Sequence, residues 1–120
     1  MKKKTLVIGA SLKENRYSNK AIKKLTAVHI PVVAIGLLKG VVASISIDTE
    51  KVLYQNIHTV TLYLNQKRQA EYYDYIIGLK PNRVIFNPGT ENKDFVSLLQ
   101  ENNIETEVAC TLVLLATNQY

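Results

Sequence analysis

A turn of small residues near the start of the chain has the residue types of a phosphate site. The apolar, strand-like segment Leu6-Val7-Ile8 runs directly into Gly9-Ala10-Ser11, and a helix-like pattern begins near Ser18. Strand, turn and helix in this order form the first unit of a nucleotide-binding fold. Unpaired N–H groups and the helix dipole would favour an anion there. Arg16 and Tyr17, just before the helix, would add a positive charge and an aromatic ring.

Polar and small residues also follow the other predicted strands. Ligands of open parallel α/β sheets bind outside the carboxyl ends of the strands, near the point where the strand order reverses. The residues at these positions are Gly36, Lys39, Tyr63, Asn65, Asn87, Pro88, Gly89, Thr90, Glu91, Asn92, Cys110 and Thr111. Any one of these loops is also explained by ordinary turn and capping chemistry. Their shared position at one sheet edge favours a ligand site.

A dinucleotide site of the NAD type is not supported by the sequence. Such a site requires glycines spaced G-x-G-x-x-G and an acidic residue at the end of the second strand, which binds the ribose. Gly9 is the only glycine before Gly36, and no Asp or Glu occurs between Glu14 and Asp48. A ribose that carries a 3′-phosphate would suit this acid-free segment, where Lys39 provides positive charge.

The sequence contains no arrangement expected to catalyse a reaction by itself. Its two histidines, His29 and His58, fall at the opposite edge of the predicted sheet, so we expect structural roles for both. Cys110 is the only cysteine, and its apolar neighbours indicate a buried core residue. Glu91 could act as a base, although the helix dipole alone favours an acidic residue at a helix start. We predict no catalytic residue and no metal site.

Strands and helices alternate along the chain. Apolar segments predict strands at about residues 5–8, 32–35, 58–64, 83–86 and 105–109, and residues 41–47 alternate as a weaker strand or edge extension. This pattern predicts an α/β fold, with a Rossmann-like, open, mainly parallel sheet of about five strands and helices on both faces. The apolar segment 110–115 is expected to pack on the sheet.

Three helices are predicted between these strands. The first starts at Ser18 as its cap, the second runs from the cap Asn65 to about Ile77 with Gly78 at its end, and the third lies before Asn102. The side chains expected to face the core are Ala21, Ile22, Leu25 and Val28 in the first helix, Ala70, Tyr73 and Ile77 in the second, and Phe95, Leu98 and Leu99 in the third.

The composition indicates a single domain over residues 1–120. A chain of 120 residues that is 47% hydrophobic can form one core but not two.

No N-terminal segment is apolar enough for a secretory signal or a membrane span, so we expect a cytoplasmic protein. The net charge of +5 favours anionic partners. Nucleic acid is not favoured, because the aromatic residues other than Tyr17 do not interleave with basic ones. Tyr72 and Tyr75 would suit plain surface or a homodimer contact.

The motifs VIGAS, NRYS, VVAIG, HTVTLYLN, RVIFNPGTEN and ACTLVLL follow one another over nearly the whole chain. In this order the chain resembles the small stand-alone CoA-binding domain proteins, whose fold also forms the CoA-binding part of the succinyl-CoA synthetase α subunit. NPGTEN is the most specific of these motifs. The resemblance implies that coenzyme A lies across Gly9 to Ser11, Arg16 to Ser18, Gly36 to Lys39, Leu62 to Asn65 and Asn87 to Asn92. Many members carry Asn-Pro where this chain has Ile35-Gly36-Leu37-Leu38.

Three functions are compatible with these observations. The preferred one is a CoA or acyl-CoA binding protein without self-contained catalysis, in which Gly9 to Ser11 and Thr90 hold phosphates and Tyr17 or Tyr63 packs against the ligand. The second is an enzyme or enzyme subunit that acts on an acyl-CoA or another nucleotide together with a partner chain. The third is a nucleic-acid or protein interaction domain that uses the basic charge.

Overall fold

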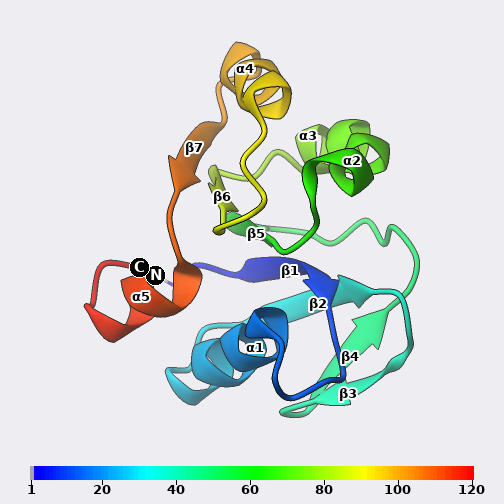
Figure 1. Cartoon of the computed structure of the whole chain (residues 1–120), viewed down its shortest axis with the longest axis vertical. Helices are drawn as coiled ribbons and strands as arrows, with labels where there is room; N and C mark the ends of the chain where they lie inside the picture. Colours follow the sequence, from blue (N-terminus) through cyan, green and yellow to red (C-terminus); the bar gives the residue numbers. More distant parts are fainter. Residues whose placement is uncertain (1) are drawn as a thin grey trace.

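A seven-stranded sheet forms the centre of the computed structural model, which describes residues 2–120 (Figure 1). The strand order is β3-β4-β2-β1-β5-β6-β7, and every neighbouring pair is parallel except β3 and β4. The strands are β1 (Thr5–Ala10), β2 (Val32–Gly36), β3 (Gly40–Val42), β4 (Ile45–Asp48), β5 (Thr59–Leu62), β6 (Arg83–Phe86) and β7 (Glu105–Val108). The predicted open, mainly parallel α/β sheet is confirmed, with seven strands instead of about five.

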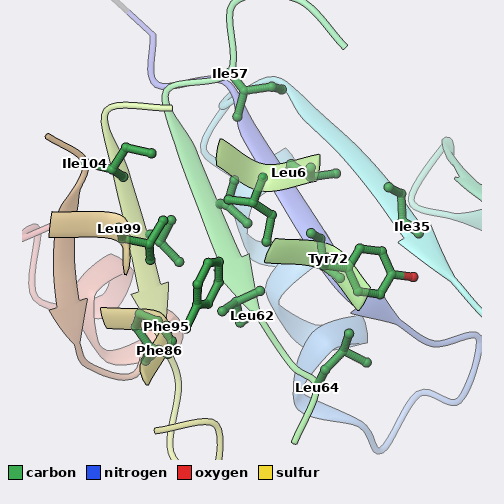
Figure 2. Close-up of a cluster of buried hydrophobic side chains, with 14 residues drawn as sticks. Leu6, Ile35, Ile57, Leu62, Leu64, Tyr72, Phe86, Phe95, Leu99 and Ile104 are labelled. Atoms are coloured by element: carbon green, nitrogen blue, oxygen red, sulfur yellow. The ribbon is translucent and has the colours of Figure 1, made fainter. Parts of the chain in front are cut away.

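Helices cover both faces of the sheet (Figure 1). On one face lie α1 (Tyr17–Ala27) and α5 (Thr111–Ala116); on the other lie α2 (Gln66–Gln69), the 3-10 turn η1 (Ala70–Tyr72), α3 (Tyr73–Leu79) and α4 (Lys93–Glu101). Successive residues of a strand point to opposite faces. Accordingly Val7 packs with Ile22 and Leu25 of α1, whereas Leu6 joins the cluster that contains Phe95 of α4 (Figure 2). No helix within residues 2–120 is long and apolar enough to cross a bilayer.

The strand predicted at residues 41–47 is a β-hairpin in the structure. β3 and β4 pair antiparallel, and the turn residues Ala43 and Ser44 have φ angles of 49° and 67°. Two consecutive positive φ angles are those of a type I′ turn, which suits a two-residue hairpin. Ala and Ser are not the residues that signal such a turn, so the sequence pattern did not reveal it. The hairpin accounts for the strands beyond the five that were predicted.

The helix predicted from Asn65 to Ile77 is interrupted. Asn65 caps its start as predicted, because its Oδ1 accepts a hydrogen bond of 3.0 Å from the Arg68 N–H. The 3-10 turn η1 then rotates the following residues, so the buried side chains are Gln69, Tyr72 and Ile76 rather than Ala70, Tyr73 and Ile77. The segment ends at Leu79, where Lys80 has a left-handed φ of 53°, and not at Gly78.

Tyr72 and Tyr75 turn toward their own chain. Tyr72 is only 9% exposed, and the Tyr75 hydroxyl donates a hydrogen bond to the Val52 carbonyl oxygen at 2.5 Å. Tyr73, expected in the core, is half-buried and stacks on Phe95 with ring centroids 4.3 Å apart. The two tyrosines considered for a subunit contact therefore hold the loop before β5 against the core cluster that contains Leu6 and Phe95.

Two further predictions about which side chains are buried are wrong in part, one at the end of α1 and one in the segment after Cys110. Val28 follows the last residue of α1 and is 45% exposed, so it does not belong to the buried face. Phe95 and Leu99 of α4 are buried as predicted, and Leu98 packs at the margin of their cluster. The segment after Cys110 forms helix α5, which buries Leu114 and Leu115 but leaves Val113 57% exposed.

Candidate functional site

A cleft of about 530 Å³ lies at the carboxyl edge of the sheet. Its walls are the β1–α1 loop with the start of α1, the β2–β3 loop, the segment from β5 into η1, and the β6–α4 loop. This is the point where strand order reverses, since β1 pairs with β2 on one side and with β5 on the other. The volume lies within the range of small-molecule sites, about 300–1,000 Å³.

Two glycines bring the strand ends close together at the floor of the cleft. A Cβ atom at Gly36 would lie 2.3 Å from the carbonyl oxygen of Ala10, and one at Gly9 would lie 2.8 Å from that of Tyr63. Gly9 also has a φ of 92°, which side chains rarely tolerate. The ends of β1, β2 and β5 are therefore in backbone contact, and no larger residue fits at either position.

The start of α1 has unsatisfied donors that face this cleft. The helix begins at Tyr17, with Arg16 as the N-cap residue, and no side chain caps it. Ser18, predicted as the cap, is instead buried in the first turn. By contrast, Asn92 caps α4, where Asp94 in the first turn adds a negative charge. The positive end of the α1 dipole is thus compensated by no side chain, as in anion-binding helix starts.

The side chains around the cleft are cationic. Lys13, Arg16 and Arg68 line it, and no Asp or Glu does. The ion pairs found within residues 2–120 are Lys23–Glu14 and Arg83–Glu107, so none of the three cleft cations is paired with a carboxylate. Several positive charges around one cleft raise the local concentration of anions. The cleft is therefore suited to a ligand that carries several negative charges.

The opposite wall is Pro88-Gly89-Thr90, which a buried glutamine fixes in place. The Gln69 Nε2 donates to the carbonyl oxygens of Thr90 (2.7 Å) and Leu64 (2.9 Å). The Asn92 side chain donates to Gln69 Oε1 at 3.0 Å. The Gln69 amide nitrogen therefore donates two hydrogen bonds and its amide oxygen accepts one. Buried amides with full hydrogen bonding order the groups around them. This network joins α2 to the β6–α4 loop.

The comparisons with known proteins agree with this architecture. The family model described as a CoA binding domain matches residues 3–116, which is nearly the whole chain. The chain belongs to the CoA-binding domain family. The family resemblance inferred from the sequence motifs is thereby confirmed.

Solved structures with the same fold include one that is 42% identical to this CoA-binding domain and others that are less than 25% identical. An uncharacterized protein with a crystal structure is 42% identical, with a TM-score of 0.97 over 100% of this chain and 99% of that chain. A Thermus thermophilus protein is 15% identical, with a TM-score of 0.86 over 99% and 91%. A hypothetical protein from Pyrococcus horikoshii OT3 is 22% identical, with a TM-score of 0.82 over 94% and 82%. The last two show the fold alone. No curated protein matches the chain.

Most of the residues selected from the sequence of this CoA-binding domain lie together around the cleft. Those that line it are Gly9, Ala10, Ser11, Arg16, Tyr17, Ser18, Gly36, Tyr63, Asn65, Pro88, Gly89 and Thr90. They come from four separate segments of the chain, which the parallel pairing of β1, β2, β5 and β6 brings to one edge.

Five selected residues do not line the cleft. Lys39 is exposed in the β2–β3 loop, and Glu91 binds the Gly89 N–H through Oε1 at 2.8 Å on the outer side of the wall. Leu62 and Asn92 are buried, in the core and at the α4 cap respectively. Asn87 is 2% exposed and joins three elements, since it donates to Leu62 and accepts from the Thr111 N–H at 2.9 Å.

Several lining residues were missed in the sequence. Arg68 and Tyr72 reach the cleft only because α2 and η1 pass beside it, and Lys13 and Leu12 because the β1–α1 loop is long. Ile35 was missed as well, whereas Leu37, Leu38 and Leu64 lie within the segments Gly36 to Lys39 and Leu62 to Asn65 that the family resemblance implied. Arg68 lies three residues after the Asn65 cap, and that spacing could have indicated a side chain directed back toward the strand end.

The groups considered for catalysis lie outside the cleft. His58 precedes β5 at the amino edge, where burial, together with the charges of Arg83 and Lys3, lowers its pKa. His29 follows α1 with a φ of 64°. Cys110 is half-buried rather than fully buried, at the N-cap position of α5. Within residues 2–120, no three His, Cys, Asp or Glu side chains form a group that could hold a metal ion.

Tyr63 lines the cleft, but its hydroxyl does not take part in a hydrogen bond. The Tyr63 hydroxyl is buried without a partner, and burial raises the pKa of this phenol to about 12. The group therefore stays protonated at neutral pH and cannot serve as a base. Its ring packs with the core cluster on the α1 face, so the residue contributes mainly an apolar surface.

Proposed function

We propose that this protein binds CoA or an acyl-CoA in the cleft and has no self-contained catalytic activity. The proposal rests on an acid-free, cationic cleft beside the uncapped start of α1, in a CoA-binding domain. CoA carries a pyrophosphate and a 3′-phosphate, so it needs several donors and cations close together. Backbone N–H groups at a helix start and arginine side chains bind phosphates well.

The pyrophosphate would lie between the two arginines. In this arrangement the free N–H groups at the start of α1 and the Ser11 hydroxyl contact one side, with Arg16 beside them. Arg68 approaches from α2 and would neutralise the charge from the other side. Arginine suits this role because its planar group can donate two parallel hydrogen bonds to a phosphate.

The adenosine would lie at the end of β2. Leu12, Leu37 and Leu38 line the cleft there and are 41%, 72% and 69% exposed, so they offer apolar surface to a base. Lys39, which the sequence suggested for the 3′-phosphate, does not line the cleft. Lys13 does, and we propose it as the cation nearest to the 3′-phosphate.

The absence of suitable catalytic groups supports a binding role. The lining of the cleft contains no His, Cys, Asp or Glu, and of its three tyrosines Tyr63 has a buried hydroxyl. General acid–base or nucleophilic catalysis most often uses such a group, and the Ser11 and Thr90 hydroxyls in the lining have no His, Asp or Glu beside them in the cleft to act as a base. Any reaction on a bound acyl-CoA would therefore need groups from another protein.

The direct test is titration calorimetry of the purified protein with CoA, acetyl-CoA, NAD and ATP, together with mass spectrometry of any ligand that copurifies. We expect binding of CoA or acetyl-CoA and much weaker binding of NAD. Binding of NAD without binding of CoA would contradict the proposal.

A matched pair of variants locates the site. Arg16→Ala should weaken CoA binding about tenfold, since one charge-assisted hydrogen bond is lost. Lys24→Ala removes an exposed cation from the last turn of the same helix, away from the cleft. It should change the affinity less than about twofold. If the two variants weakened CoA binding equally, the affinity would depend only on the net charge of the protein and not on the position of Arg16.

A further inference from the structure

The loops at the β3 edge of the sheet expose a group of apolar side chains. Leu37 and Leu38 of the β2–β3 loop remain 72% and 69% exposed although they line the cleft, and Val41 in the edge strand β3 is exposed as well. Leu12 of the β1–α1 loop lies against Gly40, where a Cβ atom would be 2.4 Å from Leu12 Cδ2. The β1–α1 loop therefore runs beside β3 (Figure 1), and Leu12, Leu37, Leu38 and Val41 form one apolar tip.

This apolar tip is more than the scattered exposure that protein surfaces ordinarily show. Single exposed leucines need no explanation. Within residues 2–120, however, half of the large apolar side chains that are exposed lie in the tip or at Tyr17 beside it. Grouped apolar side chains with a polar rim mark interaction surfaces. We therefore consider the apolar tip a docking surface.

Cations surround the apolar tip. Lys13 and Arg16 share the lining of the cleft with three leucines of the tip, and the exposed Lys39 directly follows the two leucines of the β2–β3 loop. The one carboxylate in these two loops is that of Glu14, which pairs with Lys23 at 3.8 Å. The rim of the tip is therefore positively charged.

The charges of the whole chain are divided in the same direction. Residues 2–47 contain nine Lys and Arg but a single acidic residue, Glu14, whereas residues 48–120 contain six Lys and Arg and nine acidic residues. The first segment forms the half of the molecule with α1, β2 and β3 (Figure 1). An anionic surface would attract this half and repel the other, so the protein would approach it with the apolar tip in front.

The combination of leucines and cations selects one kind of partner. In a two-fold contact with a second copy of the chain, the cations of both rims would face one another and repel. Nucleic acid would meet the cations but leave the leucines without a function, because phosphates and sugars are bound through hydrogen bonds. An anionic lipid surface suits both groups, since its headgroups attract the cations and its acyl chains accept the leucines.

We propose that the apolar tip docks on an anionic lipid surface, with Leu37 and Leu38 inserted between the lipids and Lys13, Arg16 and Lys39 beside the headgroups. The contact is peripheral and uses loops of the folded domain. It is independent of the proposed CoA binding, and the experiments below use protein without CoA.

The first experiment is cosedimentation with vesicles of phosphatidylcholine alone and of equal parts of phosphatidylcholine and phosphatidylglycerol. We expect binding to the mixed, anionic vesicles and much weaker binding to the neutral ones. Leu37→Ser/Leu38→Ser keeps the net charge and should weaken binding to the anionic vesicles about tenfold or more, because the apolar contact is lost. Val108→Ser/Val113→Ser changes two exposed valines in β7 and α5, at the opposite edge of the sheet, and should have an effect below about twofold. Thermal unfolding checks that each variant is folded.

A pair of charge reversals tests the position of the cations. Lys39→Glu and Lys93→Glu change the net charge by the same amount, and both lysines are exposed. Lys39 lies in the β2–β3 loop, whereas Lys93 is the first residue of α4. Lys39→Glu should weaken binding to the anionic vesicles at least about fivefold more than Lys93→Glu, because the attraction falls off within a Debye length. Equal losses would mean that net charge alone drives binding, and would overturn the inference.

A fluorescent reporter tests insertion directly. The chain contains no tryptophan, so an introduced one reports its own surroundings. The emission of Leu38→Trp should shift to shorter wavelength with the anionic vesicles and should be quenched by brominated acyl chains, because the indole ring enters the interface. Val108→Trp should show neither effect. An unchanged Leu38→Trp spectrum with vesicles that bind the protein would refute insertion.

The remaining outcomes also decide the inference. It is wrong if the unmodified protein binds neither kind of vesicle, or binds both equally. Self-association without vesicle binding, removed by Leu37→Ser/Leu38→Ser, would assign the apolar tip to a second copy of the chain instead. A failure to bind CoA in calorimetry would refute the proposed function alone.

Discussion

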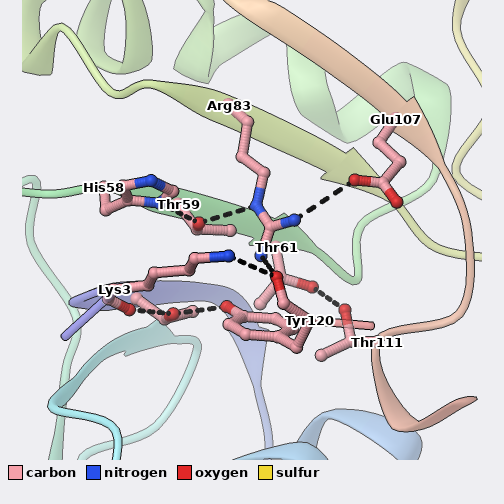
Figure 3. Close-up of polar contacts among 9 residues, drawn as sticks. Lys3, His58, Thr59, Thr61, Arg83, Glu107, Thr111 and Tyr120 are labelled. Carbon is pink, nitrogen blue, oxygen red and sulfur yellow. Dashed lines mark hydrogen bonds and ion pairs between the residues drawn. The ribbon is translucent and has the colours of Figure 1, made fainter. Parts of the chain in front are cut away.

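The guanidinium group of Arg83 lies 4.5 Å from the centre of the Tyr120 ring and donates a hydrogen bond of 2.8 Å to the Tyr120 carbonyl oxygen (Figure 3). Arg83 is only 7% exposed, and its remaining donors contact Thr59 at 2.9 Å and Glu107 at 3.2 Å. This buried cation joins β5, β6, β7 and the segment after α5 at the edge of the sheet opposite the cleft.

Replacing Arg83 should destabilise the fold substantially. Arg83→Met keeps much of the side-chain volume but removes the bonds to Thr59 and Tyr120, which we expect to cost about 2–4 kcal/mol in the free energy of unfolding. Glu107→Gln should cost less than about 1 kcal/mol, because its side chain is 37% exposed and its charge is screened. Urea denaturation measures both. Equal losses would show that the salt bridge, rather than the buried network, holds this edge.

Replacement of Gly36 and of Gly78 by alanine should change the stability of the fold in opposite directions. Gly36→Ala places a methyl group 2.3 Å from the Ala10 carbonyl oxygen, so β1 and β2 must move apart. A loss of more than about 2 kcal/mol is expected. Gly78→Ala, in α3, meets no atom within 4 Å and should stabilise by up to about 1 kcal/mol. Thermal unfolding compares them, and a stable Gly36→Ala protein would refute the close packing of the strand ends.

The two asparagine caps should differ in their contributions. Asn65 is exposed and caps only the start of α2, so Asn65→Ala should cost about 1 kcal/mol. Asn92 is 3% exposed and also donates to Gln69 and Tyr73, so Asn92→Ala leaves buried groups unsatisfied and should cost about 2–3 kcal/mol. Chemical denaturation of both variants tests this order, and a cost for Asn65→Ala equal to that for Asn92→Ala would contradict it.

The pH dependence of stability should include a contribution from His58. Burial is the main reason that the pKa of His58 lies below the ordinary value of about 6.5. The unfolded chain therefore binds a proton more readily, so stability is complete above about pH 6.5 and falls as the pH decreases below it. His58→Gln should remove part of this decrease. NMR titration of the imidazole in the folded protein checks the direction, and a raised pKa would disprove it.

The regular parts of the fold could be predicted from the sequence, because the buried strands and α4 have clear apolar periodicity. The hairpin and the break at η1 could not, because positive φ angles at Ala43 and Ser44 and a rotation within a helical segment leave no periodic signal. For the same reason the buried face of that segment was assigned to Tyr73 rather than to Tyr72.

The position of the candidate site could be predicted from the sequence as far as it depends on where the strands end. Loops that follow β1, β2, β5 and β6 meet at one edge in any parallel sheet, so Gly9, Gly36 and Gly89 could be placed together. Whether a polar residue in such a loop faces the ligand or the interior depends on packing. Asn87 and Asn92 were therefore selected for the ligand although both bind protein groups.

The backbone contacts at Gly9 and Gly36, together with the Gln69 network, have a consequence for the speed of ligand capture. The ends of β1, β2 and β5 and the far wall of the cleft are already fixed relative to one another. Little ordering entropy remains to be lost when a ligand enters, and no closing motion has to precede contact. Association should accordingly be limited by diffusion and steered by the cleft cations, and it should slow as ionic strength increases.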